Sequence, residues 1–175
     1  LNYYVIKEFG SKWYTRLDEI VTNDSFGPHS VQYYIHKGMK QFIYGINQPA
    51  GNRSFNSPFT NVSYYDAVYF KSMFGEFYYP DGTQPEWEAI DALQRIFMKL
   101  HRELRLIKPL TFPVTTACFS IKDNKIQDKE FLKFISEKNL KFGFINIYSG
   151  KSSTLSSCCR LRSEQDNEYF NSFGS

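Results

Sequence analysis

The sequence predicts an α/β protein, and three observations carry that prediction. Helix-like and strand-like segments alternate along 175 residues, 42% of the residues are apolar, and 18% are aromatic. A chain of this length and apolar content can bury one sizeable core, so we expect one domain. The alternation favours helices packed on a sheet, and the three or four strands expected here are too few to close a barrel.

The N-terminal part is expected to be mainly helical. Apolar spacing over residues 1–21 suggests helical pieces interrupted near Gly10, and residues 23–28 have the composition of a loop. Ser30 can then cap a helix, because a serine hydroxyl accepts a hydrogen bond from the first helical turn. The apolar stripe of this helix comprises Val31, Ile35, Met39, Phe42, Ile43 and Ile46.

A loop over residues 47–61, rich in turn formers, runs into a strand expected over residues 59–64. Such a loop can be a simple connection. It could also present amides, hydroxyls and Arg53 to a phosphate or sugar, although it contains neither a GxGxxG nor a Walker pattern.

Two helices are expected next. Asp66 can cap a short helix that ends at Phe74, and after the turn at residues 80–82 Thr83 can cap a longer one with Pro85 in its first turn. Acidic residues early and basic residues late in the longer helix complement its dipole. Its inward stripe is predicted to be Ile90, Leu93, Phe97, Leu100 and Leu104.

His101 lies near the end of that helix, with no second His or Cys at metal-ligand spacing. We therefore expect a surface histidine or one that complements the helix dipole.

The rest of the predicted sheet follows. Residues 114–121 are rich in β-formers, and Val114, Thr116, Cys118 and Ser120 share one face of this strand. Cys118 either lines a polar interior or packs in the core, and packing is favoured. Asp128 is expected to open a helix to about Asn139, and residues 143–148 to form a buried strand.

The strongest candidate for a chemically active segment is Ser156-Ser157-Cys158-Cys159-Arg160-Leu161-Arg162. Adjacent cysteines rarely bridge each other, so this pair is either reactive or incidental. Arg160 and Arg162 would favour a thiolate or an anionic ligand nearby. The alternative is a pair of small buried side chains at the junction of a strand and a loop.

Composition limits the partners. The net charge is +3 without a dense Lys/Arg block, so neither a nucleic-acid nor a membrane partner is expected. Three cysteines, without a signal peptide or a long apolar run, suggest a protein of the reducing cytoplasm. The chain starts on Leu1 and stops within an expected loop, so we expect a piece of something longer.

Four segments in the same order resemble the anaerobic (class III) ribonucleoside-triphosphate reductases. They are Phe42-Ile43-Tyr44-Gly45-Ile46-Asn47-Gln48-Pro49, Ser57-Pro58-Phe59-Thr60-Asn61, Thr111-Phe112-Pro113-Val114-Thr115-Thr116-Ala117 and Ser156-Ser157-Cys158-Cys159-Arg160-Leu161. The resemblance extends from about residue 30 onward. It implies that residues 1–175 form one central fragment of the catalytic domain, a ten-stranded α/β barrel shared with glycyl radical enzymes, whose finger loop would lie near the end of this chain.

The resemblance also implies roles for individual residues. Cys159 matches the finger-loop cysteine, which a glycyl radical converts to a thiyl radical that removes the hydrogen from the ribose 3′ carbon. The 2′ hydroxyl then leaves as water, and the reductant is formate or a redoxin-type thiol system. Cys158 is a neighbour rather than an essential group. Ser57, Asn61 and Arg160 are the expected substrate-binding residues for a ribonucleoside triphosphate.

Other parts of the family pattern are not found in this sequence. They include the N-terminal ATP-cone, the first strand with its partner cysteine, and the C-terminal segment with the radical glycine and a zinc site, so no metal site is expected here. The expected partners are therefore the remaining fragments of the reductase, a radical SAM activating enzyme, and ATP or dNTP effectors. The helix at residues 30–48 resembles one at the family's dimer interface, which implies a homodimer.

Two other functions remain open. Formate acetyltransferase-type glycyl radical enzymes also use adjacent cysteines, although the surrounding segments here resemble the nucleotide reductases. The chain could instead be a non-catalytic scaffold or nucleotide-binding fragment.

Overall fold

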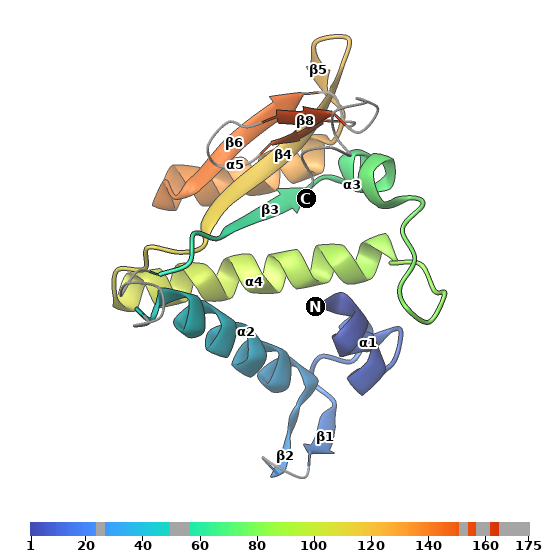
Figure 1. The fold of residues 1–175 in the computed structure, drawn as a ribbon, viewed down its shortest axis with the longest axis vertical. Helices are drawn as coiled ribbons and strands as arrows, with labels where there is room; N and C mark the ends of the chain where they lie inside the picture. The colour runs from blue at the N-terminus through green and yellow to red at the C-terminus, as the bar shows by residue number, and fades with distance from the viewer. Residues whose placement is uncertain (24–26, 50–56, 151–153, 157–161, 165–175) are drawn as a thin grey trace. The chain divides into compact units, whose positions relative to one another are not determined.

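The structure is a computed structural model that describes residues 1–23, 27–49, 57–150, 154–156 and 162–164. The chain divides into two compact units, one of Leu1–Pro58 with Tyr78–Phe112 and one of Phe59–Phe77 with Pro113–Ser175. Both combine helices with strands, so the α/β class predicted from the sequence is confirmed (Figure 1). Within the described residues, no helix combines the length and apolarity that crossing a membrane requires.

The first unit is mainly helical. Its elements are α1 (Asn2–Phe9), the 3-10 helix η1 (Trp13–Thr15), β1 (Ile20–Asn23), β2 (Gly27–Ser30), α2 (Val31–Asn47) and α4 (Trp87–Ile107). The predicted interruption near Gly10 is confirmed, because Gly10 follows α1 with a φ of 86°. Residues 20 and 21 were expected to be helical and residues 23–28 to form a loop, but residues 20–23 pair with residues 27–30 as an antiparallel hairpin.

Helix α2 begins as predicted. The Ser30 hydroxyl accepts a hydrogen bond from the Tyr33 N–H at 3.2 Å. Val31, Ile35, Met39 and Ile43 of the predicted stripe are buried, whereas Phe42 is 43% exposed. Phe42 lies at the margin of the stripe, and its ring lies 6.4 Å from that of Phe97 on α4.

Helix α4 begins later than predicted. Its N-cap is Glu86, without a side-chain capping bond, rather than Thr83. The Thr83 N–H and hydroxyl both donate to the Asp81 carboxylate, at 3.0 and 2.7 Å. Thr83 is thus part of a local turn with Asp81, a competing arrangement that the capping pattern does not distinguish.

The inward face of α4 is wider than the predicted stripe. Leu93, Phe97, Leu100 and Leu104 are buried as expected, while Ile90 is half-buried. His101 is fully buried, so its expected place on the surface is wrong. Its ring stacks near that of Phe97, with 5.9 Å between centroids, because position 101 follows position 97 by one turn on the apolar face.

The second unit contains the sheet. Its elements are β3 (Asn61–Tyr65), α3 (Ala67–Phe74), β4 (Val114–Lys122), β5 (Lys125–Ile126), α5 (Lys129–Phe142) and β6 (Ile145–Gly150), with β7 (Thr154–Ser156) and β8 (Arg162–Glu164) as a separate antiparallel pair. From α2 to β6 the predicted succession of helices and strands is confirmed. The short β5 is the one addition.

Strand β4 is the centre of this sheet and runs parallel to β3 and β6 and antiparallel to β5. Ser63 of β3 is in register with Thr116, and Cys118 is in register with both Tyr65 of β3 and Tyr148 of β6. Beyond the parallel part, β4 turns back through Asp123 and Asn124, whose φ angles are 50° and 57°. Positive φ at both central residues is typical of a tight hairpin turn, and the Asp-Asn pair is the signal that the sequence reading missed.

Helix α5 covers one face of the sheet (Figure 1). The Phe131 ring on α5 lies 5.4 Å from the ring of Phe119 on β4, and both side chains are buried. The Asp128 carboxylate caps α5 by accepting from the Phe131 N–H at 2.8 Å, as predicted. Gly143 closes α5 in the left-handed conformation, so it belongs to the helix end and not to the following strand. The expected burial of that strand is also wrong at its centre, where Ile147 is 57% exposed.

Candidate functional site

The face of the sheet opposite Phe119 carries polar side chains from all three parallel strands. Alternation along each strand puts every second residue on this face, and the register aligns the strands. We call this surface the polar face; its members are Asn61, Ser63, Tyr65, Thr116, Cys118, Ser120, Asn146 and Tyr148. Side chains of several strands therefore meet on one surface.

Asn61 connects two strands of the polar face. Its side-chain oxygen accepts a hydrogen bond from the Thr116 hydroxyl at 3.2 Å, and its amide nitrogen donates to the Ser63 hydroxyl at 3.1 Å. These bonds fix the orientation of the carboxamide, and all three side chains lie within the second unit. An oriented amide with unused donor and acceptor capacity is suited to binding hydroxyl groups.

Cys118 lies at the centre of the polar face and is almost completely buried. Burial raises the pKa of its thiol to about 12, the nearby Asp66 carboxylate adds to the rise, and a hydrogen bond with Ser63 opposes it. Cys118 is thus a neutral thiol. It is packed in the core and also lies on the polar side of the sheet, so both predicted environments apply to it. A protonated, inaccessible thiol is a poor nucleophile.

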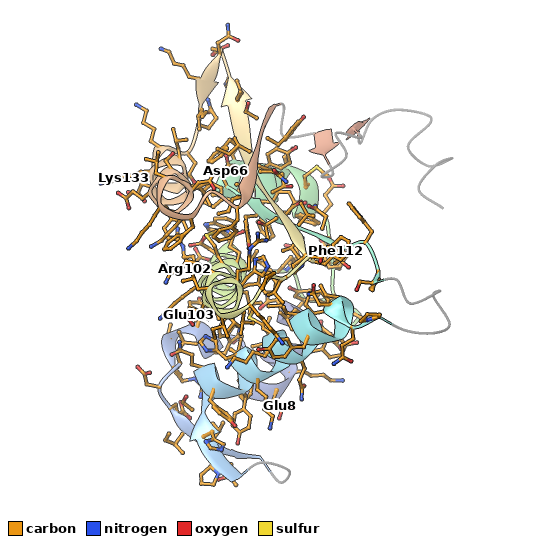
Figure 2. The ribbon with its side chains drawn as sticks, turned by 90° about the vertical axis from the view of Figure 1, so that its left-hand side faces the viewer. Glu8, Asp66, Arg102, Glu103, Phe112 and Lys133 are labelled. Carbon is orange, nitrogen blue, oxygen red and sulfur yellow. The ribbon has the colours of Figure 1, made fainter. Side chains whose placement is uncertain are left out.

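Asp66 follows β3 directly and is fully buried (Figure 2). One carboxylate oxygen accepts from the Tyr69 N–H at 2.7 Å, which confirms the predicted cap of α3. The other accepts from the N–H and the hydroxyl of Ser120, at 2.7 and 2.8 Å. Asp66 thereby joins the start of α3 to β4, a second role that local sequence does not reveal.

Tyrosines gather at the carboxyl end of these strands. The rings of Tyr65 and Tyr69 lie 5.4 Å apart. The pKa of Tyr69 is raised mainly by burial, and the neighbouring groups of Cys118, Tyr148, Tyr65 and Asp66 raise it further. Gly150 leaves room for Tyr148, since a β-carbon at Gly150 would lie 2.5 Å from the Tyr148 hydroxyl oxygen. The carboxyl ends of parallel strands are where ligands commonly bind in α/β sheets.

The polar face is uncharged along the paired strands. Residues 61–65, 114–120 and 145–150 contain no acidic or basic side chain, and Asp66 is the carboxylate next to them. Among the residues that the structure describes, no group of three or more His, Cys, Asp or Glu could hold a metal ion. The surface is suited to a neutral, hydrogen-bonding ligand group rather than to a phosphate.

The structure places some of the residues that the sequence analysis singled out. Asn61 is on the polar face, whereas Ser57 is half-buried in the coil before Pro58, in the first unit. Cys158, Cys159 and Arg160 lie outside the described residues, so their expected roles stay predictions. The sequence reading grouped Thr116, Cys118 and Ser120 correctly, but nothing in the sequence pointed to Tyr69.

Comparison with known proteins identifies the family. The family model for anaerobic ribonucleoside-triphosphate reductase matches residues 4–175. The anaerobic ribonucleotide reductase from Thermotoga maritima in complex with dATP and CTP is 34% identical with a TM-score of 0.63, and the match covers 69% of this chain and 20% of that one. The same enzyme with citrate in the active site matches at 34% identity and a TM-score of 0.62, over 69% and 21% of the two chains.

The chain thus spans about one fifth of the length of these solved reductases. It has no match among the curated proteins. A family model that accounts for nearly every residue, together with structural similarity at 34% identity, identifies the chain: it belongs to the anaerobic ribonucleoside-triphosphate reductase family.

Proposed function

We propose that this chain forms part of the catalytic barrel of an oxidoreductase that converts ribonucleoside triphosphates to deoxyribonucleoside triphosphates. The family match over residues 4–175 supports this proposal. Because the chain spans about one fifth of the solved relatives, we propose that it acts together with the other segments of a complete reductase.

The observation that carries the proposal is the uncharged polar face of β3, β4 and β6. A ribose offers neutral hydroxyl groups, and Asn61 with Thr116 and Ser63 offers oriented neutral donors and acceptors. Triphosphate oxygens need cations or backbone amides instead. We assign that role to Arg160 and the sugar to the polar face; Ser57 is proposed as a further substrate-binding residue.

In this proposal the hydrogen abstractor is Cys159. A glycyl radical supplied by another segment of the reductase would convert its thiol to a thiyl radical. The S–H bond forms again as the C3′–H bond of the ribose breaks, and the 2′ hydroxyl leaves as water. Formate or a redoxin-type thiol system supplies the two electrons, and the cycle closes when the hydrogen on Cys159 returns to C3′. Binding must position the sugar against the sulfur and exclude water, because a misplaced radical would be quenched.

The remaining assignments concern regulation and partners. The Thermotoga maritima reductase has been solved with dATP bound in its specificity site, which supports dNTP or ATP effectors for the complete enzyme. We further propose a homodimer, activation by a radical SAM enzyme, and a zinc site in another segment. Thiol chemistry of this kind requires a reducing compartment, so we place the enzyme in the cytoplasm.

The test is Cys159→Ser in the complete reductase that contains this chain. We expect the variant to fold and to acquire the glycyl radical, seen by electron paramagnetic resonance, while deoxyribonucleotide formation is abolished. Serine is nearly isosteric with cysteine, but its O–H bond is too strong for the same hydrogen exchange.

Cys158→Ser is the matched control, because it changes the neighbouring thiol and leaves Cys159 in place. It should retain measurable turnover. Deoxyribonucleotide formation by the Cys159→Ser variant would contradict the proposed mechanism. Pyruvate and coenzyme A should not be substrates of the wild-type enzyme.

A further inference from the structure

The hydroxyl of Tyr69 is buried in the second unit. The side chain is 0% exposed, and no described residue pairs with its hydroxyl. Buried polar groups in native proteins are nearly always hydrogen-bonded, because leaving one unpaired costs the free energy of its desolvation. An unpaired hydroxyl inside a candidate site therefore indicates a group that the ligand completes.

The position of Tyr69 is well determined within the second unit. Its backbone N–H donates to the Asp66 carboxylate at 2.7 Å, and this bond sets the first turn of α3. The Tyr69 ring then lies 5.4 Å from that of Tyr65, which is on the polar face. The Cys118 and Tyr148 groups are close enough to contribute to the raised pKa of Tyr69. Tyr69 thus joins the polar face from a helix, not from a strand.

Tyr64 provides a contrast inside the same unit. Its hydroxyl is also buried without a partner among the described residues. However, Tyr64 is in register with Ala117 and lies on the opposite face from Tyr65. Burial raises the pKa of Tyr64. Tyr64 therefore does not share the polar face with Tyr65, and no substrate contact is expected for its hydroxyl.

We propose that Tyr69 is a substrate-binding residue whose hydroxyl donates a hydrogen bond to a ribose hydroxyl of the ribonucleotide. This inference rests on the proposed function. The ribose is favoured over the phosphates because residues 61–65, 114–120 and 145–150 carry no charged side chain and the neighbouring Asp66 carboxylate would repel an anion. The phenol remains protonated at neutral pH, so it is available as a donor.

The experiment compares Tyr69→Phe with Tyr64→Phe in the complete reductase. Each variant removes one buried hydroxyl and keeps the ring. Binding of CTP and of cytidine is measured by calorimetry, and CTP reduction by steady-state kinetics. We expect Tyr69→Phe to weaken both ligands about tenfold, the effect of one hydrogen bond, whereas Tyr64→Phe should stay within about twofold of wild type. Neither variant should lower the melting temperature, because neither breaks a hydrogen bond among the described residues.

Each other outcome has a defined meaning. Wild-type affinity in Tyr69→Phe, or an equal loss in Tyr64→Phe, would overturn the inference while leaving the proposed function intact. A loss for CTP but not for cytidine would overturn the assignment to the ribose. If the wild-type reductase neither binds nor reduces CTP, the proposed function itself fails, and the inference fails with it.

Discussion

Asp66 and Ser120 are 54 residues apart in the sequence, yet one carboxylate oxygen of Asp66 accepts both the N–H and the hydroxyl of Ser120, at 2.7 and 2.8 Å. The second oxygen caps α3 through the Tyr69 N–H. One buried side chain therefore determines where α3 begins relative to the far end of β4. The polar face and the Tyr69 ring both depend on this arrangement.

Replacing Asp66 should therefore be strongly destabilising. Asp66→Ala leaves the Ser120 N–H, its hydroxyl and the Tyr69 N–H without their acceptor in a buried place. We expect the free energy of unfolding to fall by about 3 kcal/mol, since unsatisfied buried groups cost about 1–3 kcal/mol each and partial relaxation recovers some of it. Urea denaturation measures the change.

Asp128 offers a matched control for the charge of Asp66. It caps α5 with a single bond, to the Phe131 N–H at 2.8 Å, and asparagine caps helices equally well. Asp128→Asn should thus change stability by less than about 0.5 kcal/mol, whereas Asp66→Asn should cost about 1–2 kcal/mol because one of its acceptor oxygens becomes a donor. Equal effects of the two substitutions would contradict the special role of Asp66.

Asn47 holds the segment that leads toward β4. Its side-chain oxygen accepts from the N–H groups of Thr111 and Phe112, both at 3.0 Å, and its amide donates to the Ile43 and Phe112 carbonyls at 2.8 and 2.6 Å. Asn47→Ala should expose the Thr111 and Phe112 amides to faster hydrogen exchange and cost about 1–3 kcal/mol.

Asn47→Asp distinguishes the bonds that the Asn47 side chain accepts from those that it donates. Aspartate can still accept from Thr111 and Phe112, but it brings a negative charge against the two carbonyls that the amide served. We expect it to be nearly as destabilising as alanine. Unchanged hydrogen exchange at Thr111 and Phe112 in both variants would show that the Asn47 side-chain hydrogen bonds contribute little to stability.

Replacing Gly143 and Gly38 with alanine should change the stability of the chain in opposite directions. Gly143 ends α5 with a φ of 62°, a conformation that costs an L-residue about 1 kcal/mol, so Gly143→Ala should destabilise by about that amount. Gly38 is exposed inside α2, and a β-carbon there meets nothing within 4 Å. Gly38→Ala should stabilise the chain by about 0.5–1 kcal/mol, measured by thermal unfolding.

His101 should make the chain less stable in mild acid. Burial, and secondarily Arg105, lower the pKa of His101 from 6.5 to about 4. Because the folded-state pKa is depressed, the unfolded chain binds the proton first as the pH falls from 6.5 to 4. The free energy of unfolding should then decline across this window, by up to about 1.4 kcal/mol per pH unit.

His101→Gln removes this titration. Its unfolding free energy should depend less on pH between 6.5 and 4 than that of the wild type. The pKa of His36 is also lowered by burial, so His36 destabilises the chain in the same direction as the pH falls. A smaller dependence of the unfolding free energy on pH should therefore remain in the variant. Identical slopes in variant and wild type would rule out His101 as the source.

Local patterns predicted much of this chain because they act within a few residues. The caps at Ser30, Asp66 and Asp128 are bonds between a side chain and a backbone group three positions on. Alternation along β4 likewise put Thr116, Cys118 and Ser120 on one face. Thr83 failed as a cap because Asp81, only two residues away, offered its hydrogen-bonding groups a different partner.

By itself, the sequence determined the family, the order of helices and strands, and most of the caps, because each depends on residue types at short or family-specific spacing. Only the tertiary structure decided the burial of His101, the contact of Asp66 with Ser120, and the place of Tyr69 beside the polar face. These depend on which strands pair and in what register, and segments distant in the chain meet only when a common core forms.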